Sequence, residues 1–175
     1  MDPAKSLLLE HFRWVEGHAD VWRVFRDATA LRTIIASLVE PFRAAGITAV
    51  AGIESRGFLL GGAAAVELGV GFVAIRKAGA LFPGEKMRTV TSPDYRGKQT
   101  ELLMQRAAIG AGDRVLLVDD WIEIGSQARA VAELVSRCGG QLVAITVMID
   151  QLRDVSRETL PPVHSILLAT DLPPD

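Results

Sequence analysis

Short apolar runs alternate along this chain with longer stretches in which apolar residues recur three and four positions apart. Apolar runs with little polar alternation are typical of strands buried on both faces, and the longer spacing is typical of helices that pack on them. Strands are predicted at residues 48–53, 71–76, 114–119 and 142–149. Helices are predicted at residues 29–45, 57–68 and 125–138, ending near Gly46, Gly69 and Gly139. This order predicts an α/β fold: an open, mostly parallel twisted sheet with helices on both faces.

Composition limits the kinds of partner that the protein can bind and the cellular compartment that it suits. The 175 residues include 19 Lys and Arg and 21 Asp and Glu, so the net charge of −2 leaves no basic excess for nucleic acid or an anionic membrane. Cys138 is the only cysteine, which excludes an intramolecular disulfide and indicates a reducing compartment. No apolar run approaches the roughly 20 residues of a membrane helix, and no repeat or linker marks a second unit. We therefore expect one cytoplasmic domain spanning residues 1–175.

Three segments stand outside the alternation. Residues 1–26 are predicted to form a small N-terminal hood, and residues 163–168 a short last strand. Residues 78–104 carry Pro83-Gly84 and Ser92-Pro93 around polar segments with strand propensity. This pattern predicts a flexible hairpin that projects over the sheet.

An acidic pair gives the strongest indication of chemistry. The apolar run at residues 114–118 is followed by Asp119 and Asp120, a short loop, and a helix from Gly125. In an open α/β sheet the ligand lies beyond the carboxyl ends of the strands, where the first amides of the next helix can bind a phosphate. Two carboxylates would repel that phosphate but can accept hydrogen bonds from a sugar diol, so ribose 5-phosphate satisfies both demands. The alternative is that the acids merely end a strand and begin a turn.

This pattern resembles the type I phosphoribosyltransferases, whose signature is an apolar strand, two acids and a Thr-Gly-Gly-Thr-like loop. The resemblance implies that Asp119 and Asp120 hold the ribose hydroxyls of phosphoribosyl pyrophosphate (PRPP). It also implies a loop for the 5-phosphate, formed by Ile124, Gly125, Ser126 and Gln127. Ile124 and Gln127 replace two threonines of the family pattern, and each lost hydroxyl bond is worth about 1 kcal/mol. We expect this to weaken binding without abolishing it.

The segment TAVAGIESRGFLLGGAAAVELGVGFVAIRKAG closely resembles the adenine-specific branch of that family. The resemblance implies a pyrophosphate loop, with a cis peptide near Glu54-Ser55, formed by Glu54, Ser55, Arg56 and Gly57. The Arg56 guanidinium and the free amides of the following helix suit an anion. Lys77 is implied as a further pyrophosphate contact, whereas Arg76 alone is as well explained as a solvated cation.

Two carboxylates are candidates for the proton transfer at the base. Asp94 and Tyr95 match the tip of the family's flexible catalytic loop, where a carboxylate assists protonation and an aromatic ring closes on the donor. Asp94 is one methylene shorter than the usual Glu. Glu123 takes the place where enzymes for hypoxanthine and guanine carry the acid near N7 of the purine. Its alternative is a solvent-facing residue at a helix start.

By the same resemblance, Phe25 would stack on the base while the backbone near Val24 and Arg26 reads its edge. Phe25 could equally be a core residue. Trp121 replaces an aliphatic residue of the family pattern, so it either reshapes the base pocket or packs beneath it.

Together these features imply an enzyme that transfers 5-phosphoribosyl from PRPP to a purine-like base, releasing pyrophosphate. His11, His18 and His164 show no metal-ligand spacing, so we expect magnesium to enter with the substrate phosphates rather than on protein ligands. The expected partners are small-molecule substrates and a second copy of the chain, with neither nucleic acid nor membrane. The rival interpretation is a PRPP- or nucleotide-sensing regulatory protein with the same fold. A dinucleotide-binding dehydrogenase is disfavoured because no Gly-x-Gly-x-x-Gly follows the first strand.

Overall fold

The computed structural model describes residues 2–79, 81–93 and 97–174. The strands are β1 (Arg13–Val15), β2 (His18–Asp20), β3 (Ala49–Ile53), β4 (Gly71–Lys77), β5 (Lys86–Val90), β6 (Glu101–Gln105), β7 (Arg114–Ile122), β8 (Gln141–Asp150) and β9 (Val163–Leu168). The helices are α1 (Pro3–His11), α2 (Trp22–Arg26), α3 (Ala28–Val39), α4 (Arg56–Leu68), α5 (Ser126–Arg137) and α6 (Asp154–Arg157). Short 3₁₀ turns lie at Glu40–Phe42, Arg106–Ala108 and Ala169–Asp171. Within these ranges no helix has the length and apolarity needed to cross a membrane.

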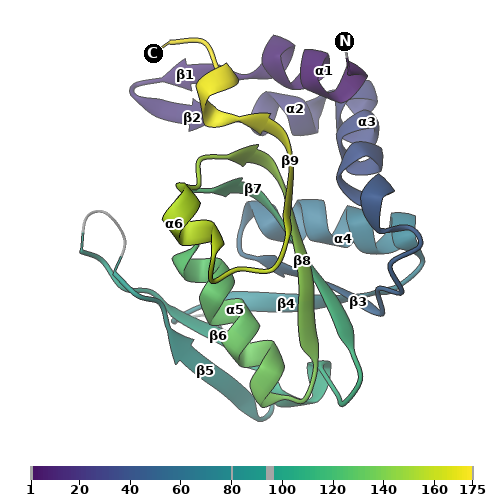
Figure 1. The fold of residues 1–175 in the computed structure, drawn as a ribbon, viewed down its shortest axis with the longest axis vertical. Helices are drawn as coiled ribbons and strands as arrows, with labels where there is room; N and C mark the ends of the chain where they lie inside the picture. The colour runs from purple at the N-terminus through teal and green to yellow at the C-terminus, as the bar shows by residue number, and fades with distance from the viewer. Residues whose placement is uncertain (1, 80, 94–96, 175) are drawn as a thin grey trace.

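A seven-stranded sheet in the order β5-β6-β4-β3-β7-β8-β9 forms the centre of the molecule (Figure 1). The five strands from β4 to β9 in this order are parallel, and α4 and α5 provide the crossovers from β3 to β4 and from β7 to β8. The predicted α/β class, parallel order and last strand are confirmed. Because all five strands run the same way, their carboxyl ends meet at one edge of the sheet.

Alternate residues of the strands enter two separate cores. Val50 and Leu116 pack with α1, α3 and α4 on one face, whereas Ala51 and Leu117 pack with α5 on the other. Both faces are therefore covered, which explains the unbroken apolar strands in the sequence. Helix α3 ends at Val39, earlier than predicted, because Pro41 in the following 3₁₀ turn has no N–H to continue the helix.

Strand β7 differs from its predicted end. It continues through Asp119 and Asp120 to Ile122, because the long strand β8 still pairs with it there, with Ile122 opposite Asp150. On its other side β7 pairs with β3 only as far as Val118. The acids therefore do not follow the strand. They lie inside it, at the step where the neighbouring strand β3 has ended.

The predicted hairpin at residues 78–104 is present but lies elsewhere. Its strands β5 and β6 are antiparallel to each other, and β6 pairs with the end of β4. The hairpin therefore extends the sheet at its edge, and was wrongly expected to project over it (Figure 1). Hydrogen bonds from β4 draw it there, through Arg76 opposite Leu103 and Lys77 opposite Leu102.

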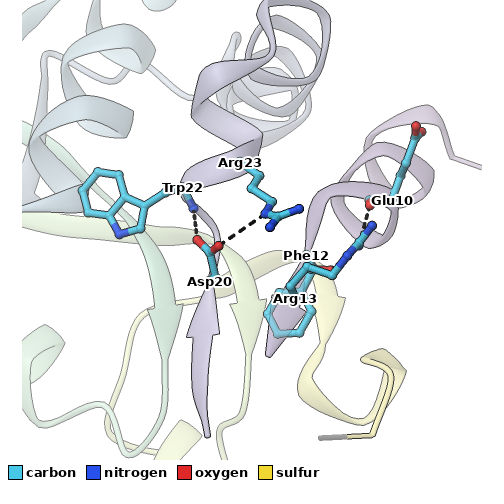
Figure 2. Close-up of polar contacts among 6 residues, drawn as sticks. All are labelled: Glu10, Phe12, Arg13, Asp20, Trp22 and Arg23. Carbon is cyan, nitrogen blue, oxygen red and sulfur yellow. Dashed lines mark hydrogen bonds and ion pairs between the residues drawn. The ribbon is translucent and has the colours of Figure 1, made fainter. Parts of the chain in front are cut away.

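The N-terminal hood consists of α1, α2 and the two-stranded sheet β1-β2 between them. Its polar links are local (Figure 2): Arg13 donates to the carbonyls of Glu10 and Phe12, both at 2.6 Å, and so satisfies the end of α1. Asp20 accepts from the Trp22 amide at 2.9 Å and lies 3.6 Å from Arg23 Nε, which joins β2 to α2. These contacts hold the small β1-β2 sheet between two helices.

Candidate active site

A cavity of about 530 Å³ opens at the carboxyl edge of the sheet, within the size range of small-molecule sites. The ends of β3, β4 and β7 and the loops after them provide most of its wall, and the hood contributes Trp14 and Ala19. Most of the site residues that the sequence predicts line this one cavity: Glu54, Ser55, Arg56, Lys77, Asp119, Asp120, Glu123, Ile124, Gly125, Ser126 and Gln127.

The two acids and Arg56 form the polar centre of the cavity. Arg56 Nη1 lies 3.0 Å from Asp120 Oδ2. This ion pair joins the first residue of α4 to the carboxyl end of β7. Asp120 is 5% exposed, and its Oδ2, although within ion-pair distance of Arg56, accepts no hydrogen bond of good geometry from the described residues. A buried carboxylate oxygen in that condition is suited to a ligand hydroxyl. The geometry therefore leaves an acceptor ready where the sequence predicts the ribose.

Asp119 is held in an electrostatically unfavourable position. Burial, together with the adjoining Asp120 carboxylate, raises the pKa of Asp119 well above its ordinary value. One Asp119 oxygen accepts the Asp120 amide at 2.9 Å, and Arg56 attracts the charge, but neither outweighs the burial. Such perturbed carboxyls are characteristic of functional sites, because folding stability alone does not favour them.

Close backbone contact brings the start of α4, which carries Arg56, against the strands β3 and β7. A Cβ on Gly52, in β3, would lie 2.1 Å from the carbonyl oxygen of Gly57 at the start of α4. A Cβ on Gly57 would in turn lie 3.2 Å from Asp119 Oδ1. Glycine at both positions therefore lets α4 begin directly against β3 and β7. Gly57 is buried beside the acid and does not line the cavity.

The predicted phosphate loop leads directly into α5. Gly125 precedes the helix with φ of +73°, and no side chain in the described part of the chain caps it. The first helical hydrogen bond runs from the Arg129 amide to the Gly125 carbonyl, at 3.0 Å. The amides of Ser126 and Gln127 therefore have no partner within the helix and are available to an anion in the cavity.

The predicted pyrophosphate residues divide into two groups. Arg56 and Lys77 present cations to the cavity, and the Glu54-Ser55 peptide is cis, as the resemblance implies. The Glu54 carboxylate instead accepts from Arg76 Nε at 2.8 Å and from the Lys77 amide at 3.0 Å. Burial favours its neutral form, but these hydrogen bonds prevail and lower the pKa of Glu54 below its ordinary value. Glu54 therefore orients the end of β4, and Arg76 is its partner rather than a solvated cation.

Of the two carboxylates predicted to transfer a proton, only Glu123 lies among the described residues. Glu123 follows β7 directly, is partly exposed and lines the cavity beside Ile124. Asp94 and Tyr95 lie outside the described residues. Of the two carboxylates, Glu123 is thus the one placed at the site.

The predicted base-binding segment is not at the cavity wall. Val24 is fully buried, and Phe25 packs on the core and contacts the Trp22 ring at a centroid distance of 5.5 Å. Arg26 is exposed and belongs to a shallow depression with His11 and Arg23. The core alternative for Phe25 therefore describes this structure, and base contact by these three residues remains a prediction.

Two tryptophans form an aromatic wall of the cavity: Trp121, which the sequence analysis places at or beneath the base pocket, and Trp14, which it does not assign. Trp14 from β1 meets Trp121 from β7 at a centroid distance of 6.4 Å, and Trp121 Nε1 donates to Gln151 Oε1 at 2.8 Å. All three residues line the cavity. Gln151 directly follows β8, so the rule that ligands lie at strand carboxyl ends could have found it. Trp14 carries no such signal, because only the fold brings the hood to this edge.

The cavity contains oxygen donors that could contact a magnesium ion bound to substrate phosphates. Among the described residues, no three His, Cys, Asp or Glu side chains gather to hold a metal. The cavity nevertheless contains the Asp119 and Asp120 carboxylates, which are hard oxygen donors of the type that Mg²⁺ accepts, directly or through water.

Comparison with known proteins agrees with this geometry. The profile of the phosphoribosyl transferase domain matches residues 26–166, which is most of the chain. The chain belongs to the phosphoribosyltransferase family. An adenine phosphoribosyltransferase of Methylococcus capsulatus is 43% identical over 152 residues, covering 85% of this chain and 86% of the relative. One from Rhizobium meliloti is 38% identical over 157 residues, with 86% of each chain covered.

Solved structures of the phosphoribosyltransferase family have the same fold. Adenine phosphoribosyltransferase from Rhodothermus marinus superposes with a TM-score of 0.84 at 36% identity, covering 94% of this chain and 98% of that one. The Saccharomyces cerevisiae enzyme, solved with an imino-altritol bisphosphate and adenine, gives 0.82 at 32% identity, with 95% and 99% covered. The type I phosphoribosyltransferase fold expected from the sequence is thereby confirmed.

Proposed function

We propose that this phosphoribosyltransferase transfers the 5-phosphoribosyl group of PRPP to adenine, yielding adenosine monophosphate and pyrophosphate. The observation that carries the proposal is the placement of Asp119, Asp120 and the open start of α5 in one cavity. Relatives about 40% identical over most of the chain are adenine phosphoribosyltransferases, which favours catalysis over the sensing alternative.

Each part of the site has a role in this proposal. Asp119 and Asp120 accept hydrogen bonds from the ribose hydroxyls, and the amides of the loop 124–127 hold the 5-phosphate. Arg56 and Lys77 stabilise the negative charge that builds on the departing pyrophosphate. For Arg56 this requires it to share or exchange its present partner, Asp120. Glu123 takes a proton from the base as the new glycosidic bond forms.

The base is proposed to lie against the aromatic wall of Trp14 and Trp121. A flat heterocycle stacks favourably on an indole, and the hood residue Ala19 leaves room beside it. This assignment differs from the Phe25 stacking that the family resemblance implies.

Three further expectations belong to the proposal. Magnesium would enter bound to the PRPP phosphates, with Asp119 and Asp120 as the nearby oxygen donors, and would supply neutralisation of the phosphate charge. The working form is a cytoplasmic homodimer, as the resemblance and the single buried Cys138 indicate. Asp94 and Tyr95 are proposed to assist catalysis, as the family resemblance implies.

A turnover assay tests the proposed reaction. The full chain, supplied with PRPP and magnesium, is incubated separately with adenine, hypoxanthine, guanine, uracil and orotate. We expect nucleotide formation with adenine to exceed that with every other base by at least about a hundredfold in kcat/KM. If PRPP binds but no base yields product, the sensing function replaces the catalytic one.

Replacing Glu123 with Gln should lower kcat by about a hundredfold, the usual contribution of a general base, because the amide cannot accept the proton. The affinity for PRPP should change less than twofold. Glu158→Gln is the matched control, since Glu158 is exposed and lies outside the cavity. Full activity of E123Q would assign proton transfer to another group, with Asp94 the first candidate.

A further inference from the structure

Arg129 contacts the predicted phosphate loop from outside the cavity. Its Nη2 donates to the carbonyl oxygen of Ile124 at 2.8 Å, and its Nη1 lies 3.4 Å from Thr159 Oγ1. Arg129 is half-buried on α5 and is not among the residues that line the cavity. The guanidinium thus bridges the loop and the segment after α6.

We propose that Arg129 is the positioning residue of the 5-phosphate loop: by holding the Ile124 carbonyl, it turns the Gly125 amide toward the bound phosphate. This inference rests on the proposed function. It assigns to this chain a residue that acts through the loop backbone, without touching the substrate.

Peptide geometry connects the two ends of this link. The Ile124–Gly125 peptide is planar and trans, so its C=O and N–H point in opposite directions. With the carbonyl held by Arg129 on the outer side, the Gly125 N–H faces the cavity that Gly125 lines. Rotation of this peptide would remove one donor from the predicted phosphate site and replace it with a repelling carbonyl oxygen.

The outer side of the loop is packed tightly enough to keep Arg129 in place. A Cβ on Gly125 would lie 2.7 Å from Leu160 Cδ1 and 3.2 Å from Arg129 Nη1. The segment that carries Leu160 is itself fixed, because Arg157 Nη2 lies 2.6 Å from Asp150 Oδ2, a carboxylate that is 3% exposed at the end of β8. Arg129 is therefore held between the loop and a segment that is tied to the end of β8.

This chain depends on such a device more than the family pattern does. Ile124 and Gln127 stand where threonine hydroxyls would hold the phosphate, so the grip relies on main-chain amides. An amide donates usefully only when its peptide plane has the correct orientation. Arg129 maintains that orientation while leaving the cavity free.

The test measures by calorimetry the affinity of the full chain for three ligands: PRPP with magnesium, ribose 5-phosphate, and pyrophosphate with magnesium. For Arg129→Gln we expect about a tenfold loss of affinity for the two ligands that carry the 5-phosphate, as for a lost charge-assisted hydrogen bond. Affinity for pyrophosphate should stay within twofold. In turnover, KM for PRPP should rise while kcat and KM for the base change little.

Two variants separate positioning from a general structural role. Arg129→Lys keeps a donor for the Ile124 carbonyl and should restore 5-phosphate affinity to within about threefold of wild type. Arg153→Gln removes the same charge from the exposed start of α6 and should bind all three ligands as wild type does.

The proposal is overturned if R129Q binds ribose 5-phosphate as tightly as wild type. It is equally overturned if R129Q loses affinity for all three ligands together with a fall in Tm that R129K does not reverse. If wild type itself binds neither PRPP nor ribose 5-phosphate, it is the proposed function that fails.

Discussion

Replacing Asp119 with Asn should weaken PRPP binding at least a hundredfold while making the unliganded protein more stable. The first effect follows from the loss of a charged acceptor for the ribose hydroxyls, where each charge-assisted hydrogen bond is worth about 1.5–3 kcal/mol. The second follows because the amide removes a half-buried carboxyl whose pKa is raised by desolvation and by the adjoining Asp120 carboxylate. Calorimetry with PRPP and thermal unfolding without ligand measure the two effects.

The stability effect has a defined dependence on pH. Burial raises the pKa of Asp119 in the folded protein, so the folded state holds this proton more tightly than the unfolded chain does. The stability it contributes is complete below the unfolded pKa of about 3.9 and is lost as pH rises through the higher folded value. The advantage of D119N should therefore be small in acid and largest at neutral pH.

Asp113→Asn is the matched control, and its expected effect on stability at neutral pH has the opposite sign. Asp113 accepts hydrogen bonds from the Gly110 amide and the Thr48 hydroxyl, both at 2.8 Å, and these lower its pKa below the ordinary value. Its contribution to stability is present above the unfolded pKa and lost as pH falls, so D113N should destabilise the protein at neutral pH and leave PRPP affinity unchanged. If D119N lowered Tm at pH 7, or bound PRPP normally, the role given to Asp119 would be wrong.

Gly52→Ala should destabilise the fold by about 3 kcal/mol or more, the upper part of the range for overpacked cores. The added methyl would lie 2.1 Å from the Gly57 carbonyl oxygen and 3.0 Å from Phe72 Cε2, and the nearest obstacle is backbone that cannot rotate away. To relieve the clash, α4 must move from β3, and with it Arg56 moves from Asp120. Urea unfolding measures the loss, and PRPP affinity should fall in parallel.

Gly62→Ala is the control for a methyl group added nearby. Gly62 lies in the interior of α4, and a Cβ there meets no heavy atom within 4 Å outside the helix's own nearby backbone. Alanine at this position should stabilise the protein by about 0.5–1 kcal/mol, because it restricts the unfolded chain. Equal stability of the two variants would show that β3 and α4 do not depend on the close approach at Gly52.

Local patterns predicted the elements of the sheet well, because buried parallel strands and their crossover helices have distinct periods. They did not predict the end of β7. Asp119 and Asp120 are polar and look like a strand end, whereas the length of β8 on one side decides that pairing continues to Ile122. The hairpin at residues 78–104 was misplaced for the same reason, since its pairing with β4 is a contact distant in sequence.

The site shows a similar division. Residues 54–56 and 119–127 could be predicted to meet, because carboxyl ends of parallel strands share one edge. Three side-chain contacts could not be predicted, because each depends on how side chains from different elements pack. They are the Arg56–Asp120 ion pair, the Arg76–Glu54 ion pair and the Trp14–Trp121 ring contact. The hood in particular has no periodic signal that would place Trp14 over the sheet.

The Trp14 ring is fastened by the last residues of the chain. Trp14 Nε1 donates to the Pro173 carbonyl at 2.8 Å, and Lys5 Nζ lies 3.0 Å from Asp171, so the two termini meet above the carboxyl edge (Figure 1). These contacts join residues more than 150 positions apart, so they depend on the tertiary fold rather than on local structure. The cavity wall at Trp14 therefore depends on residues from two distant parts of the sequence that meet only in the folded protein.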